Sequence, residues 1–405
     1  MQMTEGGQRV SADYRHGHSG CPSCGSEMRP FFEIPEVPVN SCILMKTPGE
    51  ARSYPRGDIV LGFCGDCGFI RNVAFDPALA EYSGRYEETQ GFSPTFRKFH
   101  EGLATDLIAR YGLRNKDILE IGCGKGEFLG LLCTLGPNRG VGFDPGYDKD
   151  RGVLDDVAGA RVVADFYSPQ YSGEQADLVC CKMTLEHIRE TADFVRLSRQ
   201  AMRPDSSSVL YFQVPESMRI LADCAFEDIY YEHCSYFTPG SLARLFRNEG
   251  FRILRLRTEY AGQYLAVEAQ LADGDSEAPL PEEESLETVR SAVADFETRC
   301  RARIETWRST LTEAADKGPV AVWGSGSKAV AFLGAVDTDG VVDRVVDINP
   351  YRQGHFMPGS AQPIVSPESL AEDPPATLVI MNAIYEPEIR SSLNSIGVTA
   401  NVLAI

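Results

Sequence analysis

Short apolar runs alternate with helical stretches through the middle of the chain. The run Asp117–Ile121 precedes a glycine-rich turn, and similar runs follow at 140–144, 160–165, 176–181 and 208–215. A helix is predicted over 94–111, before the first run, and helical residues separate the later ones. Strands and helices in this order predict an α/β fold with a doubly wound parallel sheet, which binds ligands at the carboxyl ends of its strands.

The C-terminal third carries two further patterns. Residues 272–285 are acidic and contain proline, which predicts a linker. Apolar residues then recur at spacings of three and four over 286–311, so a long helix is expected to pack against the chain's own domains, with a coiled-coil dimer as the alternative. Residues 320–329 follow as a strand, a G-x-G-x-x-A turn and a helix, and Asp347 closes the next strand. This pattern predicts a small Rossmann-like unit that is too short for a complete dinucleotide fold.

The glycine-rich turn after the first strand is the most informative feature of the middle segment. Its three alternating glycines let the backbone approach a ligand closely, which fits NAD as well as S-adenosylmethionine (SAM). The acids that follow favour SAM, because Asp144 can bind two ribose hydroxyls while Asp165 and the aromatic Phe166 can hold the adenine. The predicted cofactor-binding residues are Glu120, Gly122, Gly124, Gly126, Asp144, Asp165, Phe166 and Met183.

Two C-x-x-C pairs lie near the N-terminus, each followed by glycine. Two such turns aim four thiolates at one point, which predicts a closed zinc site with a structural role; a redox pair or unligated thiols are the alternatives. A small β-rich subdomain is expected between the pairs, with Cys42 as a bystander, and the segment before the first pair is expected to be disordered. The predicted ligands are Cys21, Cys24, Cys64 and Cys67.

Composition narrows the classes of partner. At roughly 100–200 residues per domain, 405 residues predict two to four domains. The chain has 58 acidic and 39 basic residues, a formal charge of −19, which disfavours nucleic acid and anionic membranes as partners. Neither a membrane span nor a signal peptide is apparent, so a cytoplasmic enzyme is expected. The predicted domains are a zinc-binding domain (1–80), a SAM-dependent methyltransferase domain (81–272), a linker with a long helix (273–316) and a Rossmann-like substrate lobe (317–405).

Three stretches carry a resemblance to a known family. Phe226–Thr238 is similar to an I-Y-x-E-H signature, and Trp323–Ala329 and Asp347–Gly359 match two C-terminal motifs. With the order of domains, they make nearly the whole chain resemble the C-methyltransferases that act on nucleotide-linked keto-deoxysugars in antibiotic pathways. Two stretches depart from the family. Its His-Gly-Gly turn is replaced by Tyr260-Ala-Gly-Gln-Tyr264, and Leu185-Glu-His-Ile188 is closer to general methyltransferases. An O- or N-methyltransferase acting on another polar metabolite is therefore the alternative.

The resemblance implies a set of catalytic residues. His233 is implied to be the general base, Tyr230 and Glu232 are carried over from the same signature, and His187 is the strand-end histidine. A tyrosine before the SAM domain also contributes to the family's site, and Tyr86 is the nearest match, with Tyr82 as runner-up.

The chemistry fits these residue types. A carbon beside a ketone becomes nucleophilic only as an enolate, which requires a base with a pKa near 7, and histidine meets this need. Tyr230 or His187 would then donate to the enolate oxygen. A buried core histidine with no catalytic part is the alternative interpretation of His233.

The C-terminal unit is predicted to contact the substrate. Lys328 and the backbone of 324–328 would hold a diphosphate at a helix N-terminus, Arg352 would pair with a phosphate, and His355 would contact the substrate from its loop. A purely structural layer and autonomous NAD binding are the alternatives for this unit. The expected ligands are SAM, structural Zn²⁺ and a small-molecule nucleotide sugar, and the chain is expected to be a monomer or homodimer. A non-enzymatic sensor of SAM or nucleotide is the alternative outside enzymology.

Overall fold

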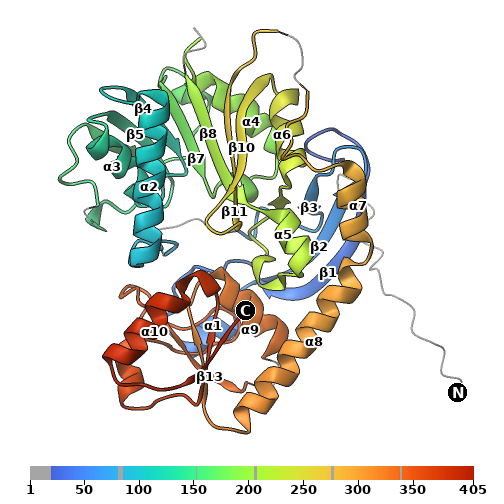
Figure 1. Cartoon of the computed structure of the whole chain (residues 1–405), viewed down its shortest axis with the longest axis vertical. Coiled ribbons are helices and arrows are strands. Elements are labelled where there is room, and N and C mark those ends of the chain that lie inside the picture. Colours follow the sequence, from blue (N-terminus) through green and yellow to red (C-terminus); the bar gives the residue numbers. More distant parts are fainter. Residues whose placement is uncertain (1–19, 81–84, 152, 205–207, 275–277, 338–339) are drawn as a thin grey trace, which may run out of the picture.

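The computed structural model arranges the chain around three sheets (Figure 1). It describes residues 20–80, 85–151, 153–204, 208–274, 278–337 and 340–405. The expected disorder before residue 20 and the candidate Tyr82 lie outside these residues. Within them, no helix is both long and apolar enough to cross a lipid bilayer.

The central sheet has seven strands in the order β10-β11-β8-β7-β4-β5-β6, and the doubly wound parallel sheet predicted from the sequence is confirmed in its five strands β4 to β8. Its strands are β4 (Asp117–Ile121), β5 (Arg139–Phe143), β6 (Ala160–Val163), β7 (Leu178–Lys182), β8 (Val209–Pro215), β10 (Phe251–Glu259) and β11 (Tyr264–Leu271). β11 is antiparallel to both β8 and β10.

Helices cover both faces of this sheet because its strands are apolar on both sides. In β7, Leu178 and Cys180 pack against one helical layer, whereas Val179 and Cys181 pack against the other. The first layer contains α2 (Pro94–Tyr111) and α3 (Glu127–Leu135), and the second contains α4 (Thr191–Ser198) and α6 (Pro239–Asn248). Because both faces of such strands are buried, their sequences are continuous apolar runs and do not alternate between apolar and polar residues.

The N-terminal sheet is antiparallel and has the order β1-β2-β3-β9. It contains β1 (Met28–Pro38), β2 (Arg56–Cys64), β3 (Ile70–Asn72) and β9 (Ser235–Tyr236), with the short helix α1 (Pro48–Arg52) before β2. β9 comes from far along the chain, directly after the I-Y-x-E-H signature, and Ile70 pairs with Tyr236. The N-terminal sheet is therefore completed by the segment predicted to carry the catalytic base.

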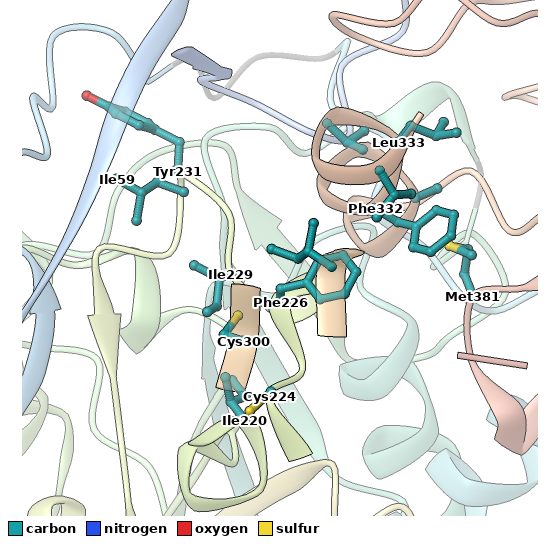
Figure 2. Close-up of a cluster of buried hydrophobic side chains, with 14 of the residues drawn as sticks. Ile59, Ile220, Cys224, Phe226, Ile229, Tyr231, Cys300, Phe332, Leu333 and Met381 are labelled. Carbon is teal, nitrogen blue, oxygen red and sulfur yellow. The ribbon is translucent and has the colours of Figure 1, made fainter. Parts of the chain in front are cut away.

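The apolar stripe over 286–311 forms two helices, although one was expected. α7 (Leu286–Ala294) and α8 (Phe296–Ala315) meet at Asp295, whose φ of −114° interrupts the helix. The stripe is buried within the chain, and Figure 2 shows Cys300 of α8 in the cluster that Phe226, Ile229 and α9 (Ser327–Val336) also enter. The two helices thus run along one side of the molecule from the central sheet to the C-terminal lobe (Figure 1).

The C-terminal lobe is a parallel sheet of order β14-β13-β12-β15-β16. Its elements are β12 (Val320–Trp323), β13 (Val342–Val346), β14 (Ile364–Val365), β15 (Thr377–Ile380), β16 (Asn401–Ala404), α9 and α10 (Glu386–Ser395). The strand, glycine turn and helix at 320–329 fold as the sequence predicts, and the turn faces the carboxyl ends of the central sheet.

Candidate active site

A cavity of about 600 Å³ lies between the central sheet and the C-terminal lobe. Its walls come from the turn between β4 and α3, the ends of β7 and β8, the signature segment around Tyr230, and the turn between β12 and α9. The three walls other than the signature segment follow the carboxyl ends of parallel strands in the two sheets, so the cavity lies where both folds place ligands.

The glycine-rich turn forms one wall and leaves no room for side chains. Gly122 has a φ of +70°, and a Cβ built on it would lie 2.0 Å from Thr184 Oγ1. The N–H of Gly124 donates to Asp144 Oδ2 at 2.9 Å, so the acid at the end of β5 also fixes the turn. Burial raises the pKa of Glu120 to about 7, and its Oε2 has no hydrogen-bond partner within the described chain. A buried acceptor of this kind fits a ligand that brings a cation or a donor, as the α-ammonium of SAM does.

The structure brings six of the eight predicted cofactor residues to the cavity. The lining contains Glu120, Gly122, Gly124, Asp144, Phe166 and Met183. Gly126 instead precedes α3 with a φ of +85°, packed beside Leu154. Asp165 also lies outside the lining, and its carboxylate accepts hydrogen bonds from Tyr171 (2.7 Å) and Gln170 (3.0 Å).

Two histidines and a tyrosine form the centre of the cavity. The ring of His233 lies 4.1 Å from that of Tyr230 and 4.8 Å from that of His187, measured between centroids. Burial, and then the neighbouring His187, lower the pKa of His233 well below its usual value. The imidazole is therefore neutral at pH 7, the form that accepts a proton, but its pKa differs from the value near 7 expected from the sequence because the ring is buried beside a second imidazole.

Glu232 and Tyr86 are joined by a hydrogen bond. Tyr86 lines the cavity and donates its hydroxyl proton to Glu232 Oε2 at 2.9 Å. Glu232 itself is buried and lies outside the lining. It also accepts from Asn40 Nδ2 (3.2 Å) and from both the N–H (3.1 Å) and the hydroxyl of Ser41. Its carboxylate thus connects the signature segment to the N-terminal domain.

A basic patch forms part of the cavity wall. Lys328 Nζ is 2.5 Å from Asp228 Oδ2, and Arg219 of α5 (Ser217–Asp223) pairs with the same carboxylate. All three side chains line the cavity, and two cations against one anion leave a net positive charge. The sequence does not predict a role for Arg219, because it occupies an ordinary position in a helix. Only its ion pair with Asp228 identifies it as part of the patch.

Arg352, His355 and Cys42 have surroundings that the sequence did not indicate. Arg352 lines the cavity, but its guanidinium donates to the carbonyls of Ser325 (2.7 Å) and Glu87, so it holds the turn before α9. His355 lies outside the lining, with Nδ1 3.3 Å from the Arg352 carbonyl. Cys42, the expected bystander, lines the cavity.

The two C-x-x-C pairs come together away from this cavity. The four sulfurs lie within 4.8 Å of one another, with 3.5 Å separating Cys21 from Cys67 and Cys24 from Cys64. A tetrahedral zinc site with Zn–S bonds of about 2.3 Å separates its sulfurs by about 3.8 Å. The donor set and its spacing therefore fit a closed zinc site.

The fold and this cavity define a class I SAM-dependent methyltransferase, and comparison with known proteins agrees. A family model described as a methyltransferase domain matches residues 96–256, and one described as a C-methyltransferase C-terminal domain matches 273–401. The chain is 31% identical over 302 residues to the C-methyltransferase NovU of Streptomyces niveus, covering 70% of each protein. The protein belongs to this SAM-dependent C-methyltransferase family, which confirms the family resemblance and implies a small-molecule substrate.

Two other similar proteins cover less than half of this chain. A ubiquinone biosynthesis O-methyltransferase of Methylobacterium sp. (strain 4-46) is 33% identical over 105 residues, which cover 24% of this chain and 41% of that protein. The solved 1,6-didemethyltoxoflavin-N1-methyltransferase of Burkholderia thailandensis is 19% identical, with a TM-score of 0.35, over 46% of this chain and 80% of that one.

Proposed function

We propose that the protein methylates the carbon beside the ketone of a nucleotide-linked keto-deoxysugar. The observation that carries this proposal is the pairing of His233 with Tyr230, whose ring centroids lie 4.1 Å apart, in the same cavity as the glycine-rich turn and the Arg219–Lys328 patch. A base, a hydroxyl donor, a SAM-type turn and an anion-binding patch in one cavity are the parts that this reaction requires.

The chain's own residues generate the nucleophile. His233 removes the proton from the α-carbon: the C–H bond breaks, an N–H bond forms, and the electron pair moves into the enolate. Tyr230 or His187 donates a hydrogen bond to the enolate oxygen, where the negative charge develops. The glycine-rich turn, Glu120 and Asp144 would hold SAM, which when bound would supply an electrophilic methyl group.

The basic patch supports a nucleotide-linked substrate. A diphosphate carries negative charge into a protein whose formal charge is −19, so its binding requires local cations. Lys328, Arg219 and the N-terminus of the ten-residue helix α9 offer positive charge at one place. The sugar would then extend from this patch toward His233.

The test uses a panel of TDP-linked 4-keto-6-deoxysugars with SAM. Product mass and S-adenosylhomocysteine (SAH) release report transfer, and NMR assigns the new methyl group to carbon. His233→Asn is expected to lose turnover and to keep its affinity for SAH. Full turnover by this variant would disprove the assigned base, and inactivity toward the whole panel with normal SAH binding would reject this substrate class.

O-methylation of another polar metabolite is the second candidate function. The stretch Leu185-Glu-His-Ile188 departs from the sugar C-methyltransferase pattern, and the relative from Methylobacterium is named as an O-methyltransferase. The same NMR measurement separates the two candidates, because a methyl group on oxygen resonates far downfield of one on carbon.

We also propose that Cys21, Cys24, Cys64 and Cys67 bind one structural Zn²⁺. Four thiolates leave no open coordination position, so the ion would stabilise the N-terminal sheet and take no part in the chemistry. Metal analysis of the purified protein should give one zinc per chain, and Cys64→Ser should lose it. Zinc that survives this substitution would place the metal elsewhere.

A further inference from the structure

Glu186 is a buried carboxylate whose oxygens accept no hydrogen bond from the described part of the chain. It lies in the 3-10 turn Leu185–His187, directly after β7, and is only 1% exposed. Neither of its carboxylate oxygens has a hydrogen-bond partner among the residues that the structure describes, although the side chain lines the reaction cavity. Buried carboxylates are normally paired, and an unpaired one next to reacting groups requires an explanation.

Its surroundings contain two imidazoles. Glu186 Oε1 lies 4.0 Å from Nε2 of His233, and ligand atoms of Glu186, His187 and His233 all lie within 4.8 Å of one another. Burial raises the pKa of Glu186 to about 8. The other titratable groups that face it are Cys181 of β7, Tyr230 and Cys234 of the signature segment, and Tyr264 of β11. None of these four side chains carries positive charge.

We propose that Glu186 is a positioning residue whose carboxylate orients His233 and stabilises the imidazolium that forms when His233 takes the substrate proton. This inference rests on the proposed function of His233 as the base. Glu186 itself gains and loses no bond in this step: the proton passes from the α-carbon to His233, and the electron pair stays on the enolate. The 4.0 Å separation in the free enzyme is expected to shorten once the imidazole is charged.

The electrostatics of the cavity require such a partner. The imidazolium of His233 would form in a buried site beside His187, which disfavours a positive charge. Glu232 is close in sequence, but its carboxylate already accepts from Asn40, Ser41 and Tyr86. Glu186 has both oxygens available and lines the same cavity, so it is placed to compensate the new charge.

The pH profile follows from this role. Glu186 compensates the imidazolium only when it is ionised, and its raised pKa keeps it largely protonated below pH 8. The value of kcat/KM is therefore expected to rise with pH up to about 8 and then level off. Glu186→Gln should remove this rise, because glutamine does not titrate.

The experiment compares Glu186→Gln with a matched control, using the TDP-sugar on which the wild type is active. We expect kcat/KM to fall by about 100-fold or more at pH 8, within the range for general acid–base catalysis, while SAH affinity stays within threefold. The control is Glu227→Gln. Glu227 is also buried, with one unpartnered oxygen, but it lies outside the cavity lining and should keep wild-type turnover.

Thermal stability separates positioning from a merely structural role. Ionising a buried, unpaired carboxylate opposes folding, so Glu186→Gln should melt at or above the wild-type temperature at pH 9 while its turnover is reduced. Loss of stability together with activity would indicate a structural role and would overturn the proposal.

Three further outcomes are decisive. Unchanged kcat/KM with an unchanged pH rise in Glu186→Gln would refute the proposal. A requirement for Mg²⁺, Mn²⁺ or Zn²⁺ that disappears in this variant would also refute it, because Glu186, His187 and His233 would then be metal ligands. Exchange of the substrate α-proton with D₂O in the presence of SAH isolates the base step. If His233→Asn abolishes exchange and Glu186→Gln does not, only this inference fails; exchange that survives in His233→Asn would reject the proposed base itself.

Discussion

Glu232 offers the sharpest test of how the N-terminal domain contributes to the site. Each of its oxygens accepts from one nitrogen and one hydroxyl: the N–H and hydroxyl of Ser41 at Oε1, and Asn40 Nδ2 with the Tyr86 hydroxyl at Oε2. In Glu232→Gln the amide NH₂ faces one of these nitrogens in either orientation. A hydroxyl can rotate to accept a hydrogen bond, whereas the Ser41 backbone N–H cannot. Asn40 could accept only by turning its amide, which would give up the hydrogen bond that Tyr54 donates to Oδ1, so either orientation costs one contact of this network.

The size of the effect follows from that lost contact. A hydrogen bond to a charged group contributes about 1.5–3 kcal/mol, which corresponds to roughly 10- to 150-fold in kcat/KM if the loss reaches the transition state in full. Because Tyr86 lines the cavity and donates to Glu232, Tyr86→Phe should lower kcat/KM through the same connection. The double variant should then be little worse than either single variant, with a coupling of about 0.5–3 kcal/mol.

The assay is SAH release with the TDP-sugar that is turned over. Tyr54→Phe is the matched control, because it removes the hydrogen bond from Tyr54 to Asn40 Oδ1 (3.1 Å), one contact further from the cavity. It should stay within about threefold of the wild type, a loss of about 0.7 kcal/mol. Fully additive losses in the Glu232→Gln/Tyr86→Phe pair would refute the idea that Glu232 acts through Tyr86.

Three other perturbations have defined outcomes. Gly122→Ala should abolish SAH binding in calorimetry, because its Cβ would lie 2.0 Å from Thr184 Oγ1; normal affinity would show that the turn moves freely. Arg219→Met should raise KM for the TDP-sugar about tenfold, a loss of about 1.4 kcal/mol, and should leave SAH affinity unchanged; an unchanged KM would exclude the patch as the diphosphate site. The pKa of Glu186 is raised from 4.5 to about 8, so the folded state binds its proton more tightly and wild-type stability falls as pH rises across that interval. We therefore expect the unfolding free energy of Glu186→Gln, measured in urea, to increase relative to that of the wild type by up to about 1.4 kcal/mol per pH unit between pH 4.5 and 8. A difference between the two proteins that does not change with pH would contradict the raised pKa.

The sequence predicted those parts of the fold that local patterns determine. The helix Pro94–Tyr111 and the strand Asp117–Ile121 have their expected bounds, because one carries a capping Ser93 before its apolar face and the other ends at a glycine turn. The spacing of the cysteines in the two C-x-x-C pairs was also sufficient to predict that the four side chains come together. Each of these signals is local, because the helix spans 18 residues, the strand five and each C-x-x-C pair four, and periodicity and turn chemistry are informative over such distances.

Features that depend on distant partners could not be predicted in this way. The break at Asp295 falls inside a continuous helical stripe, and the two helices have different neighbours: α7 contacts α5, whereas α8 contacts β1 and α9. Arg219 and Glu186 have ordinary local contexts. Arg219 is distinguished by its ion pair with Asp228, and Glu186 by two buried oxygens that accept no hydrogen bond from the described residues. The strand β9 is only two residues long, too short for a period, and exists because β3 offers it an edge.

This last pairing connects the proposed zinc site, which lies outside the cavity, to the segment that carries His233. Cys64 ends β2, β2 pairs with β3, and β3 pairs with β9, while the N–H of Asn72 donates to the Cys234 carbonyl at 3.0 Å. Cys234, the residue after His233, is thus held by the N-terminal sheet, and the four clustered cysteines lie at one end of that sheet. Removal of zinc with a chelator is therefore expected to lower kcat more than it weakens SAH binding, because the glycine-rich turn belongs to the central sheet. Equal loss of both would show that zinc supports the whole chain and not specifically the segment that carries the base.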